Sequence, residues 1–278
     1  MKMISRRSFL AAAGLSVAAL ALTACGGSSS SVASSVASSA SSEAASTSAA
    51  AGELTTVMAG KLTMATNATF PPYEMTTDSG DIEGIDVDTA KAIAEKLGLE
   101  LQIDDMDFDA ALLSVQQGKA DIAMAGITVT DERKAVMAFS DSYATGIQSV
   151  IVPEGSDIAS VDDLAGKKIG TQRGTTGYIY CSDDFGDENV VAYDDGLTAV
   201  QALNNGQVDA VVIDNAPAKE FVAANPGLVI LDTSYAEEDY AIGMAKGSAL
   251  EDAINATLEE LKADGTLQSI VDKYITAE

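Results

Sequence analysis

The feature of this sequence that most restricts its fold is a helix–turn–strand unit that occurs twice, 88 positions apart. The copies are 111–121 and 199–209, and in each a helical pattern ends at a Gly that is followed three residues later by an Asp. Apolar runs at 122–125 and 210–213 then predict buried strands. The repeat predicts two similar α/β lobes that face each other, although helix–Gly–strand units also resemble one another in unrelated folds.

Apolar runs and helical patterns alternate through the rest of the chain beyond residue 53. Residues 61–66 predict a strand, and 89–97 carry apolar side chains at helical spacing. Such alternation predicts parallel sheets covered by helices. Ligands of open α/β sheets bind outside the carboxyl ends of the strands. Gly126 and Asp214, where two of the predicted strands end, therefore mark a candidate site.

Charge and composition argue against several classes of protein. The chain has 16 Lys and Arg against 42 Asp and Glu, a net charge of −26. This balance disfavours nucleic-acid binding, which depends on Lys and Arg. His, the commonest general base and metal ligand, is absent, and the two Cys are too far apart for a zinc cluster or a CxxC pair. We therefore expect no nucleic-acid partner, no metal and no cofactor.

The first 25 residues predict an export signal. Lys2, Arg6 and Arg7 precede a 14-residue apolar run, 9–22, which is short for a membrane span but typical of a signal peptide. Residues 22–25 (LTAC) resemble a bacterial lipobox, in which Cys25 is lipidated after removal of 1–24. The pair Arg6-Arg7 also resembles a twin-arginine signal, so the Sec and twin-arginine routes both remain open. The alternative is a buried N-terminal helix with a chance Cys.

The segment that follows the lipobox predicts a tether. Residues 26–52 are almost entirely Ser, Ala and Gly and carry one charge, Glu43. Such a segment has no large side chains to bury, so we expect 25–53 to be flexible. The predicted protein is a body anchored by lipid to the extracytoplasmic face of the cell membrane. Cys181 would then be a lone thiol, which we expect to be buried rather than reactive.

Arg133 is the first candidate for ligand binding. Once 1–24 are removed, only two Arg remain in the chain. Arg133 stands at the third position of a helix that Thr130 is expected to cap, where a positive charge opposes the helix dipole. A nearby anion would explain it, and the helix N-terminus and the Thr128 hydroxyl would add further donors. The alternative is a surface Arg paired with Asp131 or Glu132.

Other candidates follow predicted strands. Asp214 could bind an ammonium group, or it could simply cap the next helix. The turn 174–177 precedes a helix expected to open at Tyr178 and offers backbone N–H groups to a carboxylate, but it lacks the spacing of a phosphate-binding loop. Phe70, beside two prolines, and Phe108 could flank a ligand or could be ordinary core residues.

Six motifs together resemble the bacterial family 3 solute-binding proteins, the polar amino-acid receptors of ABC importers. They are TNATFPPYE (66–74), GIDVD (84–88), GITVTDER (126–133), GTTG (174–177), VID (212–214) and LKADGT (261–266). The resemblance implies a type II periplasmic-binding-protein fold of two α/β lobes joined by two hinge strands. Lobe one would comprise 54–145 and 240–278, and lobe two 146–239. It also implies a monomeric binding protein rather than an enzyme, working with an ABC transporter permease.

The resemblance implies ten ligand-binding residues. The ligand carboxylate would be held by Arg133, Thr128 and the backbone of Thr176, and the ammonium group by Asp214 and the Gly126 carbonyl. Phe70 and Phe108 would flank the side chain, with Asn67 and Gln172 near its tip. The full set is Asn67, Phe70, Phe108, Ala125, Gly126, Thr128, Arg133, Gln172, Thr176 and Asp214.

Asn67 bears on the choice of amino acid. Family members that take cationic amino acids often carry an acid at this position. The neutral amide favours a polar ligand such as glutamine or cystine, with basic amino acids next. An alternative function is a dehydratase of the cyclohexadienyl type on the same scaffold, in which Glu74 could act as acid or base by its position. The sensor of a receptor kinase is a third interpretation.

Overall fold

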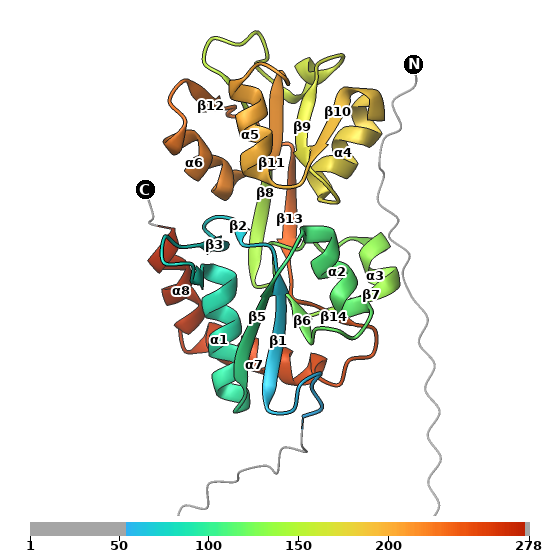
Figure 1. Ribbon diagram of the computed structural model, residues 1–278, viewed down its shortest axis with the longest axis vertical. Coiled ribbons are helices and arrows are strands. Elements are labelled where there is room, and N and C mark those ends of the chain that lie inside the picture. The colour runs from blue at the N-terminus through green and yellow to red at the C-terminus, as the bar shows by residue number, and fades with distance from the viewer. Residues whose placement is uncertain (1–53, 276–278) are drawn as a thin grey trace, which may run out of the picture. The chain divides into compact units, whose positions relative to one another are not determined.

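The computed structural model of the chain describes residues 54–275. The signal peptide, Cys25 and the tether predicted for 1–53 lie outside the described residues. The described part forms two lobes, each with its own main β-sheet, and two strands connect them (Figure 1). No helix in this part of the chain is both long and apolar enough to cross a membrane.

The first lobe contains a five-stranded sheet in the order β5-β1-β6-β14-β7, beside a small sheet β2-β3-β4. Strands β5 and β6 run parallel to β1, whereas β14 runs antiparallel to β6 and β7. The elements of this lobe are β1 (Lys61–Thr66), β2 (Thr69–Phe70), β3 (Glu74–Thr76), β4 (Ile82–Glu83), α1 (Ile85–Leu97), β5 (Glu100–Asp105), α2 (Phe108–Gln116), β6 (Ile122–Ala123), α3 (Asp131–Val136), β7 (Met137–Phe139), β14 (Gly243–Ala245), α7 (Glu251–Ala263) and α8 (Thr266–Tyr274).

The second lobe contains a six-stranded sheet in the order β10-β9-β11-β8-β12, with β13 also paired to β8. Strands β10 and β11 run parallel to β9, whereas β8 is antiparallel to all of its neighbours. The elements are β8 (Ala144–Pro153), η1 (Val161–Leu164), β9 (Ile169–Gln172), α4 (Thr176–Phe185), η2 (Asp187–Asn189), β10 (Val190–Tyr193), α5 (Gly196–Asn204), β11 (Ala210–Asp214), α6 (Asn215–Ala224), β12 (Leu228–Ile230) and β13 (Ala236–Tyr240).

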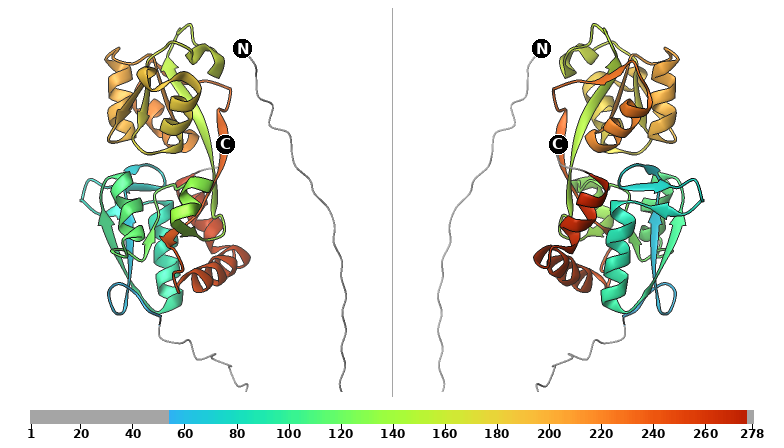
Figure 2. Two further views of the ribbon diagram at one scale, coloured as in Figure 1. Left: turned by 90° about the vertical axis from the view of Figure 1, so that its right-hand side faces the viewer. Right: turned by 90° about the vertical axis from the view of Figure 1, so that its left-hand side faces the viewer.

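Helices cover both faces of the first-lobe sheet. Successive side chains of a strand point to opposite faces. Leu62 and Met64 of β1 accordingly pack with Ile93 of α1, on the face where α1, α7 and α8 contact one another (Figure 2). Ala65 of the same strand packs with Ala111 of α2 on the other face. These side chains are completely buried, so both faces of β1 lie in the interior of the lobe.

The second-lobe sheet is covered in the same way. Val211 of β11 belongs to a cluster with Val200 of α5 and Phe221 of α6, whereas Val212 packs with Cys181 of α4. Cys181 is free and fully buried, and burial raises the pKa of its thiol to about 12. The expectation of a buried rather than reactive thiol agrees with this environment.

Two neighbouring strands carry the chain between the lobes. Strand β8 leaves the first lobe after β7, and β13 returns to it before β14; the two strands pair antiparallel, with Glu238 opposite Gly146. Figures 1 and 2 show them side by side between the two sheets. Position 146 has to lack a side chain, since a Cβ there would lie 2.4 Å from Cζ of Tyr240.

The repeated unit has the same structural role in both lobes. Helices α2 and α5 each lead through a left-handed Gly to an Asp next to the following strand. The Asp121 carboxylate accepts the backbone N–H of Thr63 at 2.8 Å, and the Asp209 carboxylate accepts that of Lys168 at 2.7 Å. Thr63 lies in β1 and Lys168 directly precedes β9, so each Asp fixes the beginning of the adjacent parallel strand.

Several expectations need correction. The sheets are mixed rather than parallel, because β8 and β14, which the chain enters directly after it passes from one lobe to the other, run antiparallel to their neighbours. Strand β6 ends at Ala123, so Gly126 lies beyond the strand rather than at its end. The helix predicted for 89–97 begins at Ile85, because the run from 85 to 88 forms its first turn after Gly84.

Candidate functional site

All ten residues predicted to bind a ligand line one pocket between the lobes, here called the interlobe pocket. It encloses about 440 Å³ of space, part of it open to solvent. Its lining comes from both lobes and from both connecting strands, so any movement of one lobe against the other changes its shape. The lining residues are Asn67, Phe70, Glu74, Phe108, Ala125, Gly126, Thr128, Arg133, Gln148, Gln172, Thr175, Thr176, Val212, Ile213, Asp214 and Tyr240.

Arg133 is a buried cation. Thr130 caps α3 and accepts the Arg133 N–H at 3.1 Å, as the sequence predicts. Arg133 is 8 % exposed. Its guanidinium lies 5.3 Å from the centre of the Phe108 ring and donates to the carbonyls of Thr128 at 2.8 Å and of Gly174 at 3.1 Å. Burial lowers its pKa.

The surroundings of Arg133 decide between the two interpretations of this residue. Within residues 54–275 its guanidinium has no carboxylate within 4.0 Å, and Asp131 and Glu132 are exposed. The alternative of a solvated Arg paired with Asp131 or Glu132 is therefore wrong. A buried cation without a carboxylate partner is unfavourable. Three of its five N–H donors remain for an anion in the pocket.

Asp214 is the matching buried acid at the end of β11. It is 2 % exposed and caps α6: Oδ1 accepts the N–H of Ala216 at 3.0 Å, and Oδ2 accepts that of Ile147 at 2.6 Å. Burial raises the pKa of Asp214 to about 6, although both backbone hydrogen bonds act in the opposite direction. The capping role is thus real. A carboxylate has further lone pairs, so capping leaves room for a donor from the pocket.

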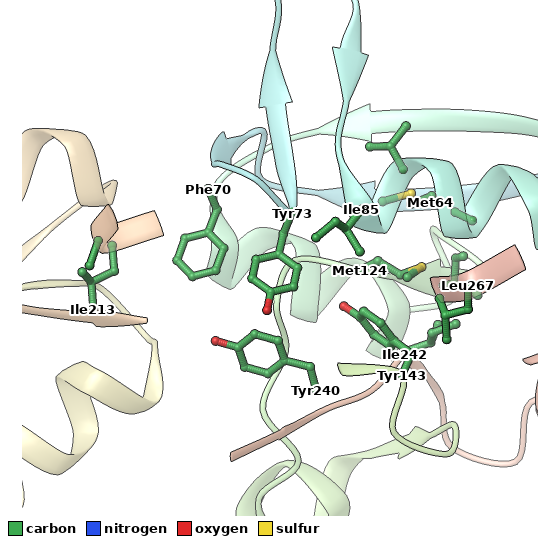
Figure 3. Close-up of a cluster of buried hydrophobic side chains, with 14 of the residues drawn as sticks. Met64, Phe70, Tyr73, Ile85, Met124, Tyr143, Ile213, Tyr240, Ile242 and Leu267 are labelled. Carbon is green, nitrogen blue, oxygen red and sulfur yellow. The ribbon is translucent and has the colours of Figure 1, made fainter. Parts of the chain in front are cut away.

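Phe70 and Tyr240 of the pocket lining both contact Tyr73, which is outside the lining. Phe70 stacks on Tyr73 with ring centroids 5.9 Å apart, and Tyr73 meets Tyr240 edge-on at 5.4 Å. Figure 3 shows these three rings together, with Ile213 of the second lobe opposite Phe70. Gly126 has φ 54°, and a Cβ there would lie 2.8 Å from the Phe70 ring, so the position excludes larger residues.

Two amides meet at another part of the pocket. Asn67 Oδ1 accepts from Gln172 Nε2 at 2.8 Å, which joins the loop after β1 to the end of β9 in the other lobe. Asn67 also donates to the Met106 carbonyl at 3.0 Å and accepts from Thr69. The Asn67 amide is therefore held in one orientation by neighbours from both lobes.

The Thr128 hydroxyl is not the free donor that the sequence suggests. Its Oγ1 donates to Glu238 Oε2 at 3.1 Å, and Thr176 Oγ1 donates to the same oxygen at 3.0 Å. Helix α4, whose first residue is Thr176, begins two residues before the expected Tyr178 because Thr175 caps it. These contacts place a buried carboxylate directly behind the pocket lining.

Glu74, which lines the pocket, is paired with the carboxyl group of Asp86. Both side chains are fully buried. Asp86 accepts hydrogen bonds from the Tyr143 hydroxyl at 2.7 Å and from the Gly126 N–H at 3.1 Å. Neither carboxyl oxygen of Glu74 has a hydrogen-bond partner. Burial and the neighbouring Asp86 raise the pKa of Glu74 well above its usual range, and burial raises that of Asp86 to about 6. Burial and the neighbouring acid thus both favour the protonated form of Glu74.

The paired carboxyl groups predict that stability falls as pH rises. A folded-state pKa above that of the unfolded chain means that the native state binds more protons, so the free energy of unfolding decreases between the two values. Asp86 contributes to this fall up to about pH 6, and Glu74, whose pKa is raised well above its usual range, contributes to it as well. Each proton accounts for about 1.4 kcal/mol per pH unit. Urea unfolding from pH 5 to pH 8 measures this slope.

Two variants isolate the contribution of Glu74. Glu74→Gln keeps a hydrogen-bond donor towards Asp86 but cannot ionise, so we expect a flatter slope from pH 6 to pH 8 and greater stability than the wild type at pH 8. Glu95→Gln removes the same charge from an exposed position of α1 and should leave the slope unchanged. An unchanged slope in Glu74→Gln would mean that Glu74 is already ionised in the folded protein.

Six pocket residues were not assigned to binding from the sequence. Ile213 and Thr175 directly adjoin assigned residues, and Val212 lies two positions before Asp214, so all three could have been found by proximity in the sequence. Gln148 and Tyr240 lie on the connecting strands β8 and β13, and no local pattern indicates that these strands pass behind the pocket. Glu74 was considered only as an enzymatic acid. Within the described residues no group of His, Cys, Asp and Glu has the arrangement of a metal site.

Comparison with known proteins identifies the family. The model of the bacterial extracellular solute-binding proteins, family 3, matches residues 62–277. The chain belongs to this family. Its two-lobed α/β fold is the one expected for it, and as a family 3 solute-binding protein it has a substrate-binding role.

Relatives and solved structures align with most of the length of this family 3 protein. It is 32 % identical over 275 residues to a probable histidine-binding protein of Neisseria gonorrhoeae, covering 96 % of this chain and 95 % of the relative. It is 31 % identical to the L-cystine-binding protein TcyJ of Escherichia coli, covering 79 % and 84 %. A solved structure titled as an ancestral arginine-binding protein bound to glutamine is 42 % identical with a TM-score of 0.75, covering 79 % of this chain and 100 % of that one.

Proposed function

We propose that this family 3 protein captures one polar amino acid in the interlobe pocket and delivers it to the permease of an ABC importer. Relatives named for histidine and cystine, and a structure named for arginine and glutamine, support the substrate class. The ten predicted residues would form the site, and 54–145 with 240–278 and 146–239 would be the limits of the two lobes. The protein would act as a monomer.

The observation that carries this proposal is the pair of opposite buried charges in one pocket. Arg133 offers free donors without a carboxylate partner, and Asp214 offers a carboxylate. An amino acid supplies the complementary carboxylate and ammonium group on one carbon. Binding it would provide each buried charge with a counter-charge, which compensates for its lost hydration.

The neutral end of the pocket favours glutamine or cystine, with basic amino acids next. Asn67 and Gln172 present amides rather than an acid. A dehydratase is less well supported than a binding protein, because the relatives are named for binding and Glu74 is occupied by its contact with Asp86. Incubation with prephenate, followed by absorbance of an aromatic product, would reveal that activity.

A thermal-shift screen against the twenty amino acids and cystine tests the proposed function. A compound at 100 times its Kd adds about 2.7 kcal/mol of apparent stability. We expect one or a few polar amino acids to raise Tm, and their deaminated analogues to have little effect. No shift with any amino acid, for a protein that unfolds cooperatively, would contradict the proposal.

Gly174 tests whether binding requires the lobes to close. A Cβ at Gly174 would lie 1.7 Å from Oδ1 of Asp109, which belongs to α2 of the other lobe. Gly174→Ala should therefore weaken binding of the amino acid by about two- to threefold, because the clash arises only when the lobes meet and the exposed Asp109 side chain can turn away from it. Calorimetric titration measures the change.

The control for Gly174→Ala is Gly166→Ala. Gly166 has a similar left-handed φ of 75°, but a Cβ there meets nothing within 4 Å, so this variant carries the backbone strain without the clash. Affinity should be normal in Gly166→Ala and partly restored in the double variant Gly174→Ala, Asp109→Ala. Equal weakening by both single variants would attribute the effect to strain rather than closure.

Cys25→Ser should release the protein from the membrane without changing its affinity. This prediction extends the proposal to a lipid anchor at Cys25, for which the sequence LTAC at 22–25 and the Ser/Ala-rich segment after it are the support. Fractionation of cells that express each variant measures it, with Cys181→Ala as the control that keeps Cys25. Unchanged membrane association of Cys25→Ser would contradict the proposed lipid anchor at Cys25 without bearing on the proposed binding function.

A further inference from the structure

A buried carboxylate outside the pocket lining connects both lobes behind the pocket. Glu238 of β13 is 6 % exposed. Its Oε2 accepts hydrogen bonds from Thr128 Oγ1 at 3.1 Å, Thr176 Oγ1 at 3.0 Å and Gln148 Nε2 at 2.9 Å. These donors belong to the first lobe, the second lobe and the connecting strand β8. One oxygen atom thus contacts each part of the structure that forms the pocket.

This carboxylate fixes the direction of the two threonine hydroxyls. A carboxylate only accepts, and a hydroxyl has a single proton, so Thr128 and Thr176 both direct their protons at Glu238. Their oxygens lie 3.3 Å apart, and neither can donate to the other while both donate to Glu238. Both threonines line the pocket. Towards a bound molecule, these two oxygens can therefore only accept hydrogen bonds.

We propose that Glu238 is a positioning residue that makes this part of the site select molecules with an amino group. The inference rests on the amino-acid function proposed above. An ammonium group brings three N–H donors, which suit the Thr128 and Thr176 oxygens and the Asp214 carboxylate. A deaminated analogue has no donor there and leaves buried acceptors unpaired, which weakens its binding.

Glu238 orients the two hydroxyl groups without using the hydrogen-bond donors of the Arg133 guanidinium. The two side chains form no ion pair within 4.0 Å, yet the negative charge of Glu238 favours the protonated guanidinium and partly offsets the effect of burial on its pKa. Arg133 consequently keeps free donors for a carboxylate. The hinge strand thus supplies a group that separates the pocket into an accepting end and a donating end.

The test compares an amino acid with its deaminated analogue in three variants. Glu238→Met removes the acceptor but keeps a side chain of similar length, and Glu238→Gln keeps an acceptor oxygen without the charge. Glu237→Gln, at an exposed position of the same strand, is the matched control. Calorimetry measures Kd for three pairs: L-glutamine and glutaramic acid, L-arginine and guanidinovaleric acid, and L-cystine and dithiodipropionic acid.

We expect the wild type and Glu237→Gln to prefer the amino acid of at least one pair strongly. In Glu238→Met that preference should fall by roughly tenfold or more, because one freed hydroxyl can then donate to the other and fewer acceptors are left unpaired beside the analogue. Glu238→Gln should keep most of the preference. Equal weakening of both compounds by Glu238→Met would make Glu238 a purely structural link and overturn the inference. If Glu238→Gln loses as much of the preference as Glu238→Met, the effect comes from the charge of Glu238 rather than from its acceptor oxygen, and the inference is overturned as well.

Two further outcomes are decisive. If Glu238→Met does not fold, Thr176→Val removes one of the two hydroxyls instead. Thr176→Val should then weaken binding of the amino acid more than binding of the analogue. Equal weakening of the two affinities would overturn the inference. A wild type that binds none of the three amino acids would overturn the proposed ligand class itself and this inference with it, which distinguishes that failure from the failure of Glu238 alone.

Discussion

Arg133→Ala should weaken amino-acid binding by about a hundredfold or more, and Arg133→Lys almost as severely. Charge-assisted hydrogen bonds contribute about 1.5–3 kcal/mol each, and the guanidinium can make two parallel bonds to a carboxylate. Lys keeps the charge but loses the planar fork. We therefore expect a loss between about tenfold and several hundredfold for Lys, measured by titration calorimetry.

Arg173→Ala is the matched control for this experiment. Arg173 is the other Arg of the described part of the chain; its side chain is 55 % exposed, and it pairs at 3.5 Å with Asp194. It lies outside the residues that line the interlobe pocket, so its removal should leave affinity unchanged. Near-native affinity in Arg133→Ala would mean that the ligand carboxylate is held elsewhere, and the proposed site would be wrong.

Asp214→Asn should weaken the binding of an amino acid by about tenfold to a hundredfold, and the binding of its deaminated analogue much less. An ammonium group that enters the pocket needs a counter-charge, and Asn does not supply one. The variant should still fold, because Asn caps helices about as well as Asp. Loss of one acceptor towards the Ile147 N–H should lower stability by about 1 kcal/mol.

The same residue predicts how binding depends on pH. Because the pKa of Asp214 is raised to about 6, its carboxyl group becomes protonated and neutral as pH falls below that value. Affinity of the wild type for the amino acid should therefore fall from pH 7 to pH 5, with a smaller change for the analogue. In Asp214→Asn the ratio of the two Kd values should be nearly constant over this range. Equal loss for both compounds in Asp214→Asn would leave Asp214 only its capping role.

Local sequence patterns predicted much of the fold and the position of the site. The strand Lys61–Thr66, the Thr130 cap and the repeated helix–Gly–Asp–strand unit are where the patterns placed them, because each depends on neighbours in the chain. The ten site residues that the family resemblance implied line one pocket.

What the sequence did not predict depends on contacts between distant segments. The partners of Glu238 lie 62, 90 and 110 positions away along the chain, so no local pattern indicates that its carboxylate accepts three hydrogen bonds. The pairing of Glu74 with Asp86, and the antiparallel entry of β14 into the first sheet, have the same origin. Chemically, these are the residues that determine the protonation of the pocket and the direction of its hydroxyl groups.

A crystal structure of the protein with the amino acid that most raises its Tm tests the central claim most directly. The account predicts that the amino acid lies in the interlobe pocket, with its α-carboxylate within hydrogen-bond distance of the Arg133 guanidinium and its α-ammonium group within that distance of Asp214. An amino acid bound outside this pocket, or inside it with its carboxylate turned away from Arg133, would contradict the account.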